Sequence, residues 1–185
     1  VVMCLDRGGI VGEDGVTHHG VFDMAAFGAV PGLTIAAPMD ELELRNMMYT
    51  GLQYGHPFMI RYPRGNGAGR RWRGVPFEAL PVGRGRRLRE GTDVALVTVG
   101  TVGNAAARAA ERAAAKGVSV AHYDLRFAKP LDEALLAGVG AEFRHVVTVE
   151  DGSLRGGVGE AVTAFFNARG CEVAVHSLGI GDEWV

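Results

Sequence analysis

A glycine-rich stretch near the start of the chain carries side chains that can bind or transfer charge. Residues 6–20 read Asp-Arg-Gly-Gly-Ile-Val-Gly-Glu-Asp-Gly-Val-Thr-His-His-Gly. The guanidinium of Arg7 can grip a phosphate with two hydrogen bonds. The carboxylate of Asp14 can accept from a hydroxyl, and the imidazole of His18 can move a proton near neutral pH. Together they suit a small polyhydroxylated anion; an ordinary turn followed by a threonine-capped helix is the structural alternative.

A second arginine follows a different predicted strand. Residues 61–67 read Arg-Tyr-Pro-Arg-Gly-Asn-Gly, and Arg64 lies in a stiff Pro-Gly turn. The carboxyl ends of parallel strands meet at the edge where open α/β sheets bind ligands. We therefore expect Arg64 to reach the same phosphate as Arg7, assisted by the amides of a helix that starts near Gly20. A simple strand-to-linker turn is the alternative.

Other motifs give little support to other chemistries. Gly157-x-Gly159 is a near match to the dinucleotide fingerprint, but Val162 stands where a third small residue belongs. This favours glycines that let a helix pack on the sheet. Adjacent His18 and His19 do not predict a metal site, because consecutive side chains diverge. Hydrolase, Walker, zincin and Cys-x-x-Cys motifs are absent. We expect no metal-binding or cofactor-binding residue within this chain.

Composition excludes several classes of protein. The chain has 185 residues, of which 48% are hydrophobic, so one large or two small packed domains are expected rather than a disordered tail. No apolar run approaches the roughly 20 residues of a membrane helix. A formal charge of -2 gives no overall attraction to nucleic acid or anionic lipid. We therefore expect neither a nucleic acid nor a membrane as a partner.

Predicted strands and helices alternate along the chain. The strands are predicted at 1–5, 33–37, 58–62, 94–99, 118–123, 145–150 and 172–177. The helices are predicted at 21–30, from a capping pair at 40 and 43 to 52, and at 102–116, 131–136 and 159–168. This alternation predicts an α/β fold of two mostly parallel sheet units, covered on both faces. We place the units at 1–80 and 93–185, joined by a linker at 81–92.

The segment 64–91 is rich in arginine, which leaves two interpretations open. It can be an RNA-binding or phosphate-binding patch, or a solvated linker whose arginines pair across an interface. Sparse aromatic residues favour the linker.

The cysteines and the chain ends indicate origin rather than chemistry. Two cysteines cannot build a disulfide framework. We expect Cys4 and Cys171 to be buried, reduced thiols in a cytoplasmic protein of bacterial type. Because the chain opens directly on a core strand without a starting Met, we expect a fragment of a longer polypeptide.

Motifs along essentially the whole chain resemble one enzyme family. The matching stretches are 6–23, 37–41, 48–51, 61–66, 124–132 and 148–151. They resemble the 1-deoxy-D-xylulose-5-phosphate synthases, whose wider relatives are transketolase and the β subunit of the pyruvate dehydrogenase first component. The resemblance implies a partial pyrimidine-binding domain followed by a truncated transketolase C-terminal-like domain.

The resemblance also implies a function. It implies a thiamine-diphosphate transferase that joins a two-carbon unit from pyruvate to D-glyceraldehyde 3-phosphate, for isoprenoid and thiamine biosynthesis. Arg7 and Arg64 would hold the triose phosphate, Asp14 would line the substrate channel, and His18 would bind substrate and act in catalysis. The main ligands of thiamine diphosphate and magnesium are expected upstream, in the N-terminal part of the same polypeptide. A homodimer is expected, and the fragment alone is expected to be inactive.

Two other functions compete with this one. A non-catalytic regulatory or assembly module would keep the core pattern and lose the four candidate residues, which are all present. A transketolase-like enzyme with a different acceptor would keep them. An upstream Gly-Asp-Gly loop and a glutamate facing the pyrimidine would decide the class of cofactor.

Overall fold

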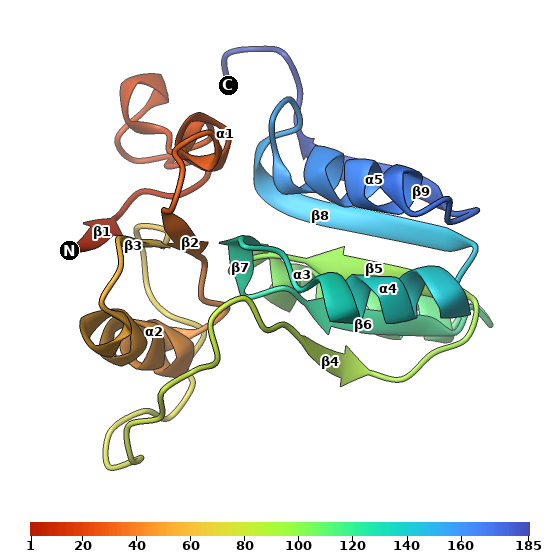
Figure 1. The fold of residues 1–185 in the computed structure, drawn as a ribbon, viewed down its shortest axis with the longest axis horizontal. Coiled ribbons are helices and arrows are strands. Elements are labelled where there is room, and N and C mark those ends of the chain that lie inside the picture. The colour runs from red at the N-terminus through yellow and green to blue at the C-terminus, as the bar shows by residue number, and fades with distance from the viewer.

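The computed structural model describes residues 1–185 and contains two sheets (Figure 1). The first unit consists of β1 (Val2–Leu5), the short 3₁₀ helix η1 (Val16–His18), α1 (Asp23–Gly28), β2 (Thr34–Ala36), α2 (Glu41–Tyr54) and β3 (Phe58–Arg61). The second consists of β4 (Arg86–Arg89), β5 (Val94–Thr98), α3 (Val102–Ala114), β6 (Val120–Asp124), α4 (Glu133–Glu142), β8 (His145–Ser153), α5 (Val158–Ala168) and β9 (Ala174–Ile180). A short strand from the second half of the chain, β7 (Phe127–Lys129), completes the first sheet.

Both sheets are mostly parallel, which confirms the predicted α/β class. The first has the order β1-β3-β2-β7, with β1 and β2 parallel to β3 and with β7 antiparallel to β2. The second has the order β4-β6-β5-β8-β9, in which β4 alone is antiparallel. Parallel pairing brings the carboxyl ends of β1 and β3 to one edge, where the two predicted anion-binding stretches begin.

Local sequence explains where the helices begin. The Asp40 side chain accepts the Glu43 N–H at 2.9 Å, and the Glu43 carboxylate accepts the Met39 N–H at 3.0 Å. This reciprocal arrangement satisfies free amides at the start of α2. At α4, Asp132 accepts the Leu135 N–H at 3.0 Å in the same manner.

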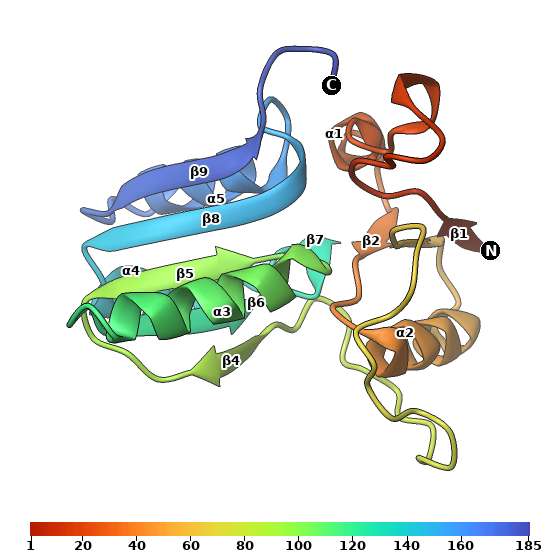
Figure 2. The same cartoon turned by 180° about the vertical axis from the view of Figure 1, so that it is seen from behind.

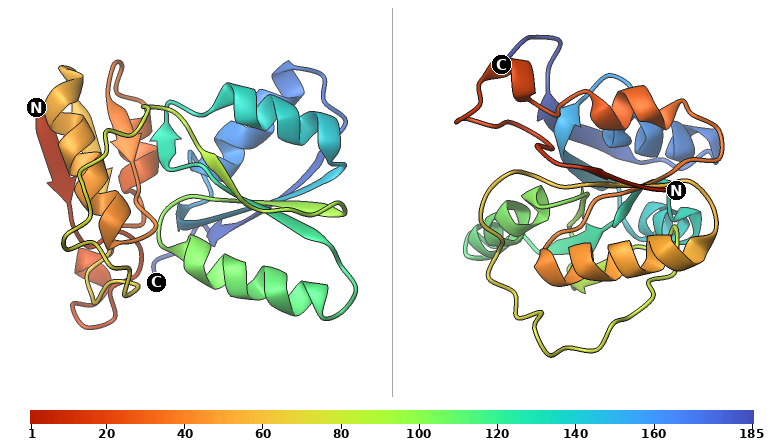
Figure 3. Two further views of the ribbon diagram at one scale, coloured as in Figure 1. Left: turned by 90° about the horizontal axis from the view of Figure 1, so that it is seen from below. Right: turned by 90° about the vertical axis from the view of Figure 1, so that its left-hand side faces the viewer.

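Helices cover both faces of the second sheet, as Figure 3 shows. On one face, Ala106 and Ala110 of α3 pack on Leu96 and Val120. On the other, α4 and α5 contribute part of a larger cluster, including Leu136, Val139, Val162 and Phe166. This packing buries the apolar stripes of the helices against an apolar sheet.

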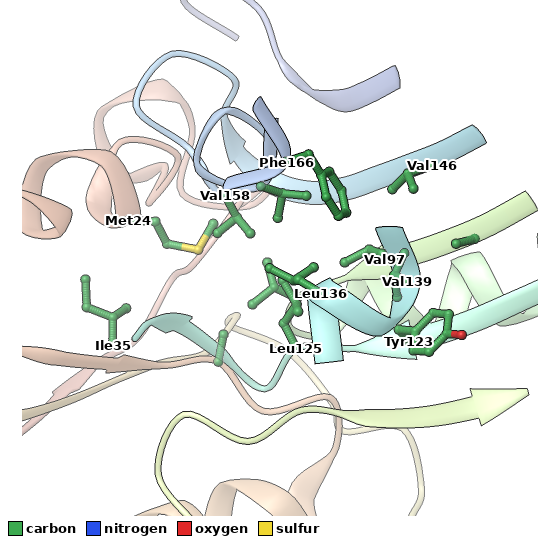
Figure 4. Close-up of a cluster of buried hydrophobic side chains, with 14 of the residues drawn as sticks. Met24, Ile35, Val97, Tyr123, Leu125, Leu136, Val139, Val146, Val158 and Phe166 are labelled. Carbon is green, nitrogen blue, oxygen red and sulfur yellow. The ribbon is translucent and has the colours of Figure 1, made fainter. Parts of the chain in front are cut away.

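The larger cluster continues into the first unit. Met24 and Ile35 face Leu125 and Val158 of the second unit in Figure 4. The chain end also returns to the first unit, near α1, as Figure 2 shows. There Trp184 packs edge-on against Phe22 with ring centroids 5.4 Å apart. A shared core fixes the two units relative to each other.

Several expectations need correction. Residues 81–92, expected to be a linker, contain β4, and β7 was not predicted at all. Cys4 is exposed rather than buried, because β1 is an edge strand with a neighbour on one side only. Cys171 is half-buried. None of the helices combines the length and apolar character needed to cross a bilayer.

Candidate functional site

Residues 6–20 form a loop closed at its base, which we call loop 6–20. The N–H of Gly20 donates to the carbonyl oxygens of Arg7 at 2.9 Å and Gly9 at 3.0 Å, and Gly9 N–H returns to Gly20 O at 3.0 Å. Gly8 N–H donates to Tyr62 O at 2.9 Å, which joins the loop to the residue after β3. A Cβ on Gly20 would lie 2.4 Å from the Arg7 carbonyl oxygen, so only glycine fits there. The sequence therefore builds a closed loop at the carboxyl end of β1.

Three of the four predicted site residues meet at this loop. Arg7 Nε donates to Asp14 at 2.7 Å, and Arg64 donates to the other oxygen of the same carboxylate. Arg7 also pairs with Asp6 at 2.6 Å, and Arg64 with Glu13 at 3.3 Å. The two guanidiniums, 57 positions apart in sequence, thus converge on one anionic group.

The charges of this cluster determine how an anion could bind to Arg7 and Arg64. Hydrogen bonds from Arg64 and then from Arg7 lower the pKa of Asp14 to about 2, so its carboxylate is ionised at neutral pH. Asp6, Glu13 and Asp14 together outnumber the two arginines. A phosphate would have to displace Asp14 in order to take both guanidiniums.

His18 lies on the same loop but outside the cluster. It is exposed on η1, and its Nδ1 is 2.9 Å from the Thr17 hydroxyl; no hydrogen bond joins it to Arg7, Asp14 or Arg64. The neighbouring His19 has a structural contact, since its Nδ1 accepts the Val11 N–H at 3.0 Å across the loop. The two histidines therefore have different surroundings.

The helix expected to start near Gly20 does not serve the cluster. It begins at Asp23, and the Asp23 carboxylate accepts the N–H of Met24 at 2.7 Å. The short helix η1 (Val16–His18) lies between Asp14 and α1 in the chain. The predicted contribution of helix amides to an anion site is therefore absent, and the side chains of Arg7 and Arg64 remain as candidate ligands.

Arg61 is a central residue that sequence reasoning missed. It lies at the end of β3 with 2% of its side chain exposed, between Asp23 at 2.9 Å and Asp151 of β8. An arginine closing the otherwise apolar strand Phe-Met-Ile-Arg was the available signal, because a charge is seldom buried without a partner.

The near match to the dinucleotide fingerprint has a structural role. The carboxylate of Glu150 accepts the N–H groups of Val158 at 3.0 Å and Gly159 at 2.8 Å. These are the amides that a pyrophosphate would use at the start of α5. A Cβ on Gly157 would lie 2.2 Å from the Ser153 carbonyl oxygen, so this glycine allows close packing.

Ion pairs account for much of the arginine-rich segment. Arg84 pairs with Asp132 at 3.1 Å, Arg87 with Glu90 at 3.0 Å, and Arg86 with both Asp124 at 3.0 Å and Glu43 at 2.9 Å. The last of these joins the two units, as the linker interpretation predicts. Arg70, Arg71 and Arg73, which belong to no ion pair, lie exposed on the projecting loop before β4.

The carboxylates at the ligand edge do not fit a site for a metal and a diphosphate. Such a site needs free oxygen ligands for the divalent cation. Here Asp6 and Asp14 pair with Arg7, and Asp23 and Asp151 pair with Arg61. No group of three or more His, Cys, Asp or Glu side chains has an arrangement that could hold a metal.

Comparisons with known proteins agree with this architecture. The family model "Transketolase, pyrimidine binding domain" matches residues 1–69, and "Transketolase, C-terminal domain" matches residues 83–185. Curated relatives named 1-deoxy-D-xylulose-5-phosphate synthase are 55% identical in Bacteroides fragilis and 44% identical in Carboxydothermus hydrogenoformans, each over 100% of this chain. The chain spans 29% of the length of those relatives.

A solved structure shows the same fold. A chain titled "Split gene transketolase, inactive beta4 tetramer" superposes with a TM-score of 0.85 at 27% identity, over 98% of this chain and 58% of that one. Together with the family models, this identifies both units: the chain belongs to the transketolase family, with a pyrimidine-binding domain followed by a C-terminal domain.

Proposed function

We propose that the full-length protein is a thiamine-diphosphate-dependent transferase that condenses pyruvate with D-glyceraldehyde 3-phosphate, giving 1-deoxy-D-xylulose 5-phosphate and CO2. The names of the relatives that match the whole chain support this reaction. The family implies thiamine diphosphate. Because the carboxylates at the ligand edge of this chain pair with Arg7 and Arg61, we place the ligands of the diphosphate and of magnesium in the N-terminal part of the polypeptide.

This chain supplies the side of the site that binds the acceptor phosphate. The observation that carries this assignment is the convergence of Arg7 and Arg64 on the single carboxylate of Asp14. The phosphate of the acceptor displaces Asp14 and takes hydrogen bonds from both guanidiniums. Asp14, once released, accepts from an acceptor hydroxyl. His18, which is exposed on the same loop, donates a proton to the aldehyde oxygen as the new bond forms.

The remaining organisation follows from this reaction. Residues 1–80 form the later part of the pyrimidine-binding domain, and most of the C-terminal domain follows, with β4 as its first strand. The enzyme works as a cytoplasmic homodimer, and the 185-residue chain alone is inactive.

The experiment is a product assay on the full-length protein with thiamine diphosphate and magnesium. Pyruvate and D-glyceraldehyde 3-phosphate should give 1-deoxy-D-xylulose 5-phosphate and an equal amount of CO2. A ketose phosphate donor in place of pyruvate should give no transfer. Transfer from the ketose phosphate without CO2 release would favour a transketolase with another donor and acceptor, and would contradict the proposal.

A further inference from the structure

Arg61 is a buried cation for which the proposed reaction gives no role. Its Nε donates to the two oxygens of Asp23 at 2.9 and 3.1 Å, and its Nη1 donates to the Asp151 carboxylate. Its Nη2 donates to the carbonyl oxygens of Gly20 at 2.9 Å and Asp151 at 3.2 Å. Every nitrogen of this guanidinium therefore has a partner.

These partners come from three parts of the molecule. Gly20 closes loop 6–20, Asp23 begins α1, and Asp151 belongs to β8 of the second unit. Arg61 itself ends β3. One side chain therefore joins the base of the loop to both sheets.

The base of the loop also packs directly on this group. A Cβ on Gly8 would lie 3.0 Å from Arg61 Nε, and a Cβ on Gly9 would lie 2.7 Å from the Asp151 carboxylate. Glycine at both positions lets the backbone lie against the ion pair without an intervening side chain. A shift of the Arg61–Asp151 ion pair would therefore move the backbone of the residues that follow Arg7.

Charge pairing opposes the cost of burying this cation. Burial acts to lower the pKa of Arg61, but Asp151 and Asp23 outweigh it and the pKa is raised. Burial raises the pKa of Asp23, against the opposing effect of Arg61. Removing one partner of such a buried ion pair leaves an uncompensated charge. A substitution of either residue alone is therefore expected to destabilise the protein.

We propose that Arg61 is a positioning residue for the anion site: through Asp151 it ties the base of loop 6–20 to the second unit, so that Arg7 faces Arg64. This inference rests on the proposed function, because it assigns the C-terminal domain a part in holding the acceptor. Arg61 does not touch the acceptor. It positions loop 6–20, and residues of that loop contact the acceptor.

The test compares Asp151→Asn, Arg61→Met and Arg61→Lys in the full-length protein. Asp151→Asn is the main variant, because Asp151 is 24% exposed and Asn has nearly its shape. Hydrogen exchange of the peptide covering residues 6–20 reports loop position without reference to activity. Steady-state kinetics report KM and kcat for D-glyceraldehyde 3-phosphate.

The matched control is Arg126→Lys. Arg126 Nε donates to Glu43 at 2.7 Å, which is also an ion pair between the units, but neither residue contacts loop 6–20. A general loosening of the two units would therefore affect the control as well. An effect specific to loop 6–20 would leave the control unchanged.

The inference predicts faster exchange in loop 6–20 for Asp151→Asn and Arg61→Met. It also predicts a rise in KM of about 10-fold or more, the usual cost of a misplaced charge-assisted contact, with a smaller change in kcat. Arg61→Lys should restore part of both effects, and Arg126→Lys should show neither. Unchanged exchange in Asp151→Asn would overturn the inference.

One further outcome separates this inference from the proposed function. Faster exchange with an unchanged KM would also overturn the positioning role. If Arg7→Ala still weakened only the phosphorylated acceptor, the proposed function would stand without it. If Arg7→Ala weakened the phosphorylated and unphosphorylated acceptors equally, the assignment of the phosphate site would fail as well.

Discussion

Asp14 decides whether the two arginines of loop 6–20 and of the turn after β3 are free to bind an anion. Its carboxylate holds both guanidiniums, and its lowered pKa of about 2 keeps it charged at every physiological pH. The structure thus contains an anion of its own where the acceptor phosphate is proposed to bind. Phosphate binding is then an exchange of one anion for another.

Replacing Asp14 by Asn tests this competition. Asn has nearly the same shape but no charge, so inorganic phosphate should bind more tightly once its competitor is neutral. We expect the inhibition constant of phosphate against D-glyceraldehyde 3-phosphate to fall several-fold in Asp14→Asn. Phosphate inhibition that is weakened instead would mean that Asp14 organises the arginines rather than competing with the ligand.

His18 and His19 provide a second comparison at the scale of single residues. His18→Ala should lower turnover by roughly 10²–10⁴, the usual contribution of a positioned acid or base. His19→Ala should act differently, because it removes the acceptor of the Val11 N–H and loosens the loop. Its main effect should be on KM and on the exchange of residues 6–20. Equal losses of kcat at both positions would indicate structural damage in each case.

Among the secondary-structure elements, the start of α5 shows how a phosphate-like motif is used for packing. Glu150 satisfies the first amides of the helix, and burial raises the pKa of this carboxyl against the effect of those hydrogen bonds. Gly157 lies against both Ser153 O and the Glu150 carboxylate. The helix therefore needs a residue without a side chain at this position.

Gly157→Ala should destabilise the protein by about 1–3 kcal/mol through overpacking. Gly138→Ala is the matched control, because a Cβ at this position in α4 has no neighbour within 4 Å. The control should leave the free energy of unfolding unchanged or raise it by up to about 1 kcal/mol. Urea denaturation of both variants measures the difference, and similar effects would contradict this explanation.

The same elements show what the sequence can predict. The capping pair Asp40 and Glu43 is a local signal and occurs as predicted. The apolar residues of α2 did not predict its buried face, because Met47 is buried while Met48 and Leu52 are exposed. β4 was not predicted, because its arginines suggest a solvated linker, and its pairing depends on distant carboxylates such as Asp124. β7 has three residues and joins the sheet of the other unit, which no local pattern indicates.

In the candidate site, too, local features were predicted and long-range contacts were not. Strand ends and glycines placed Arg7, Asp14 and Arg64 at one edge, and the structure brings these three together. That both arginines share the Asp14 carboxylate depends on the folded loop, and spacing along the chain does not reveal it. The role of Arg61 depends on Asp151, which lies 90 positions away in β8, so spacing within a motif could not reveal it.

Across the whole molecule, a buried histidine makes stability depend on pH. His122 of β6 is 1% exposed, and its Nε2 lies 2.9 Å from the Thr98 hydroxyl. Burial, with a smaller effect from Arg86, lowers the pKa of His122 from 6.5 to about 4. The folded state therefore keeps the ring neutral while the unfolded chain takes up a proton.

Stability should consequently fall as the pH drops from 6.5 towards 4. Between pH 7 and pH 5 the expected contribution of His122 is roughly 2 kcal/mol, because each pKa unit of difference corresponds to about 1.4 kcal/mol. His122→Gln cannot take up the proton and should lose that part of the slope. Urea denaturation at both pH values measures it, and an unchanged slope in the variant would assign the pH dependence to other groups.

The two units share one core and meet again at Arg61 and Asp151, at the base of the loop that carries the proposed acceptor site. The central claim is that Arg7 and Arg64 bind the acceptor phosphate. Its most direct test is kcat/KM for D-glyceraldehyde 3-phosphate and for D-glyceraldehyde in full-length Arg7→Ala and Arg64→Ala. Each variant should lose about 10-fold to 100-fold with the phosphorylated aldehyde, the cost of one charge-assisted contact, and little with the unphosphorylated one. An equal fall with both aldehydes would contradict the claim and would leave the arginines as structural partners of Asp14.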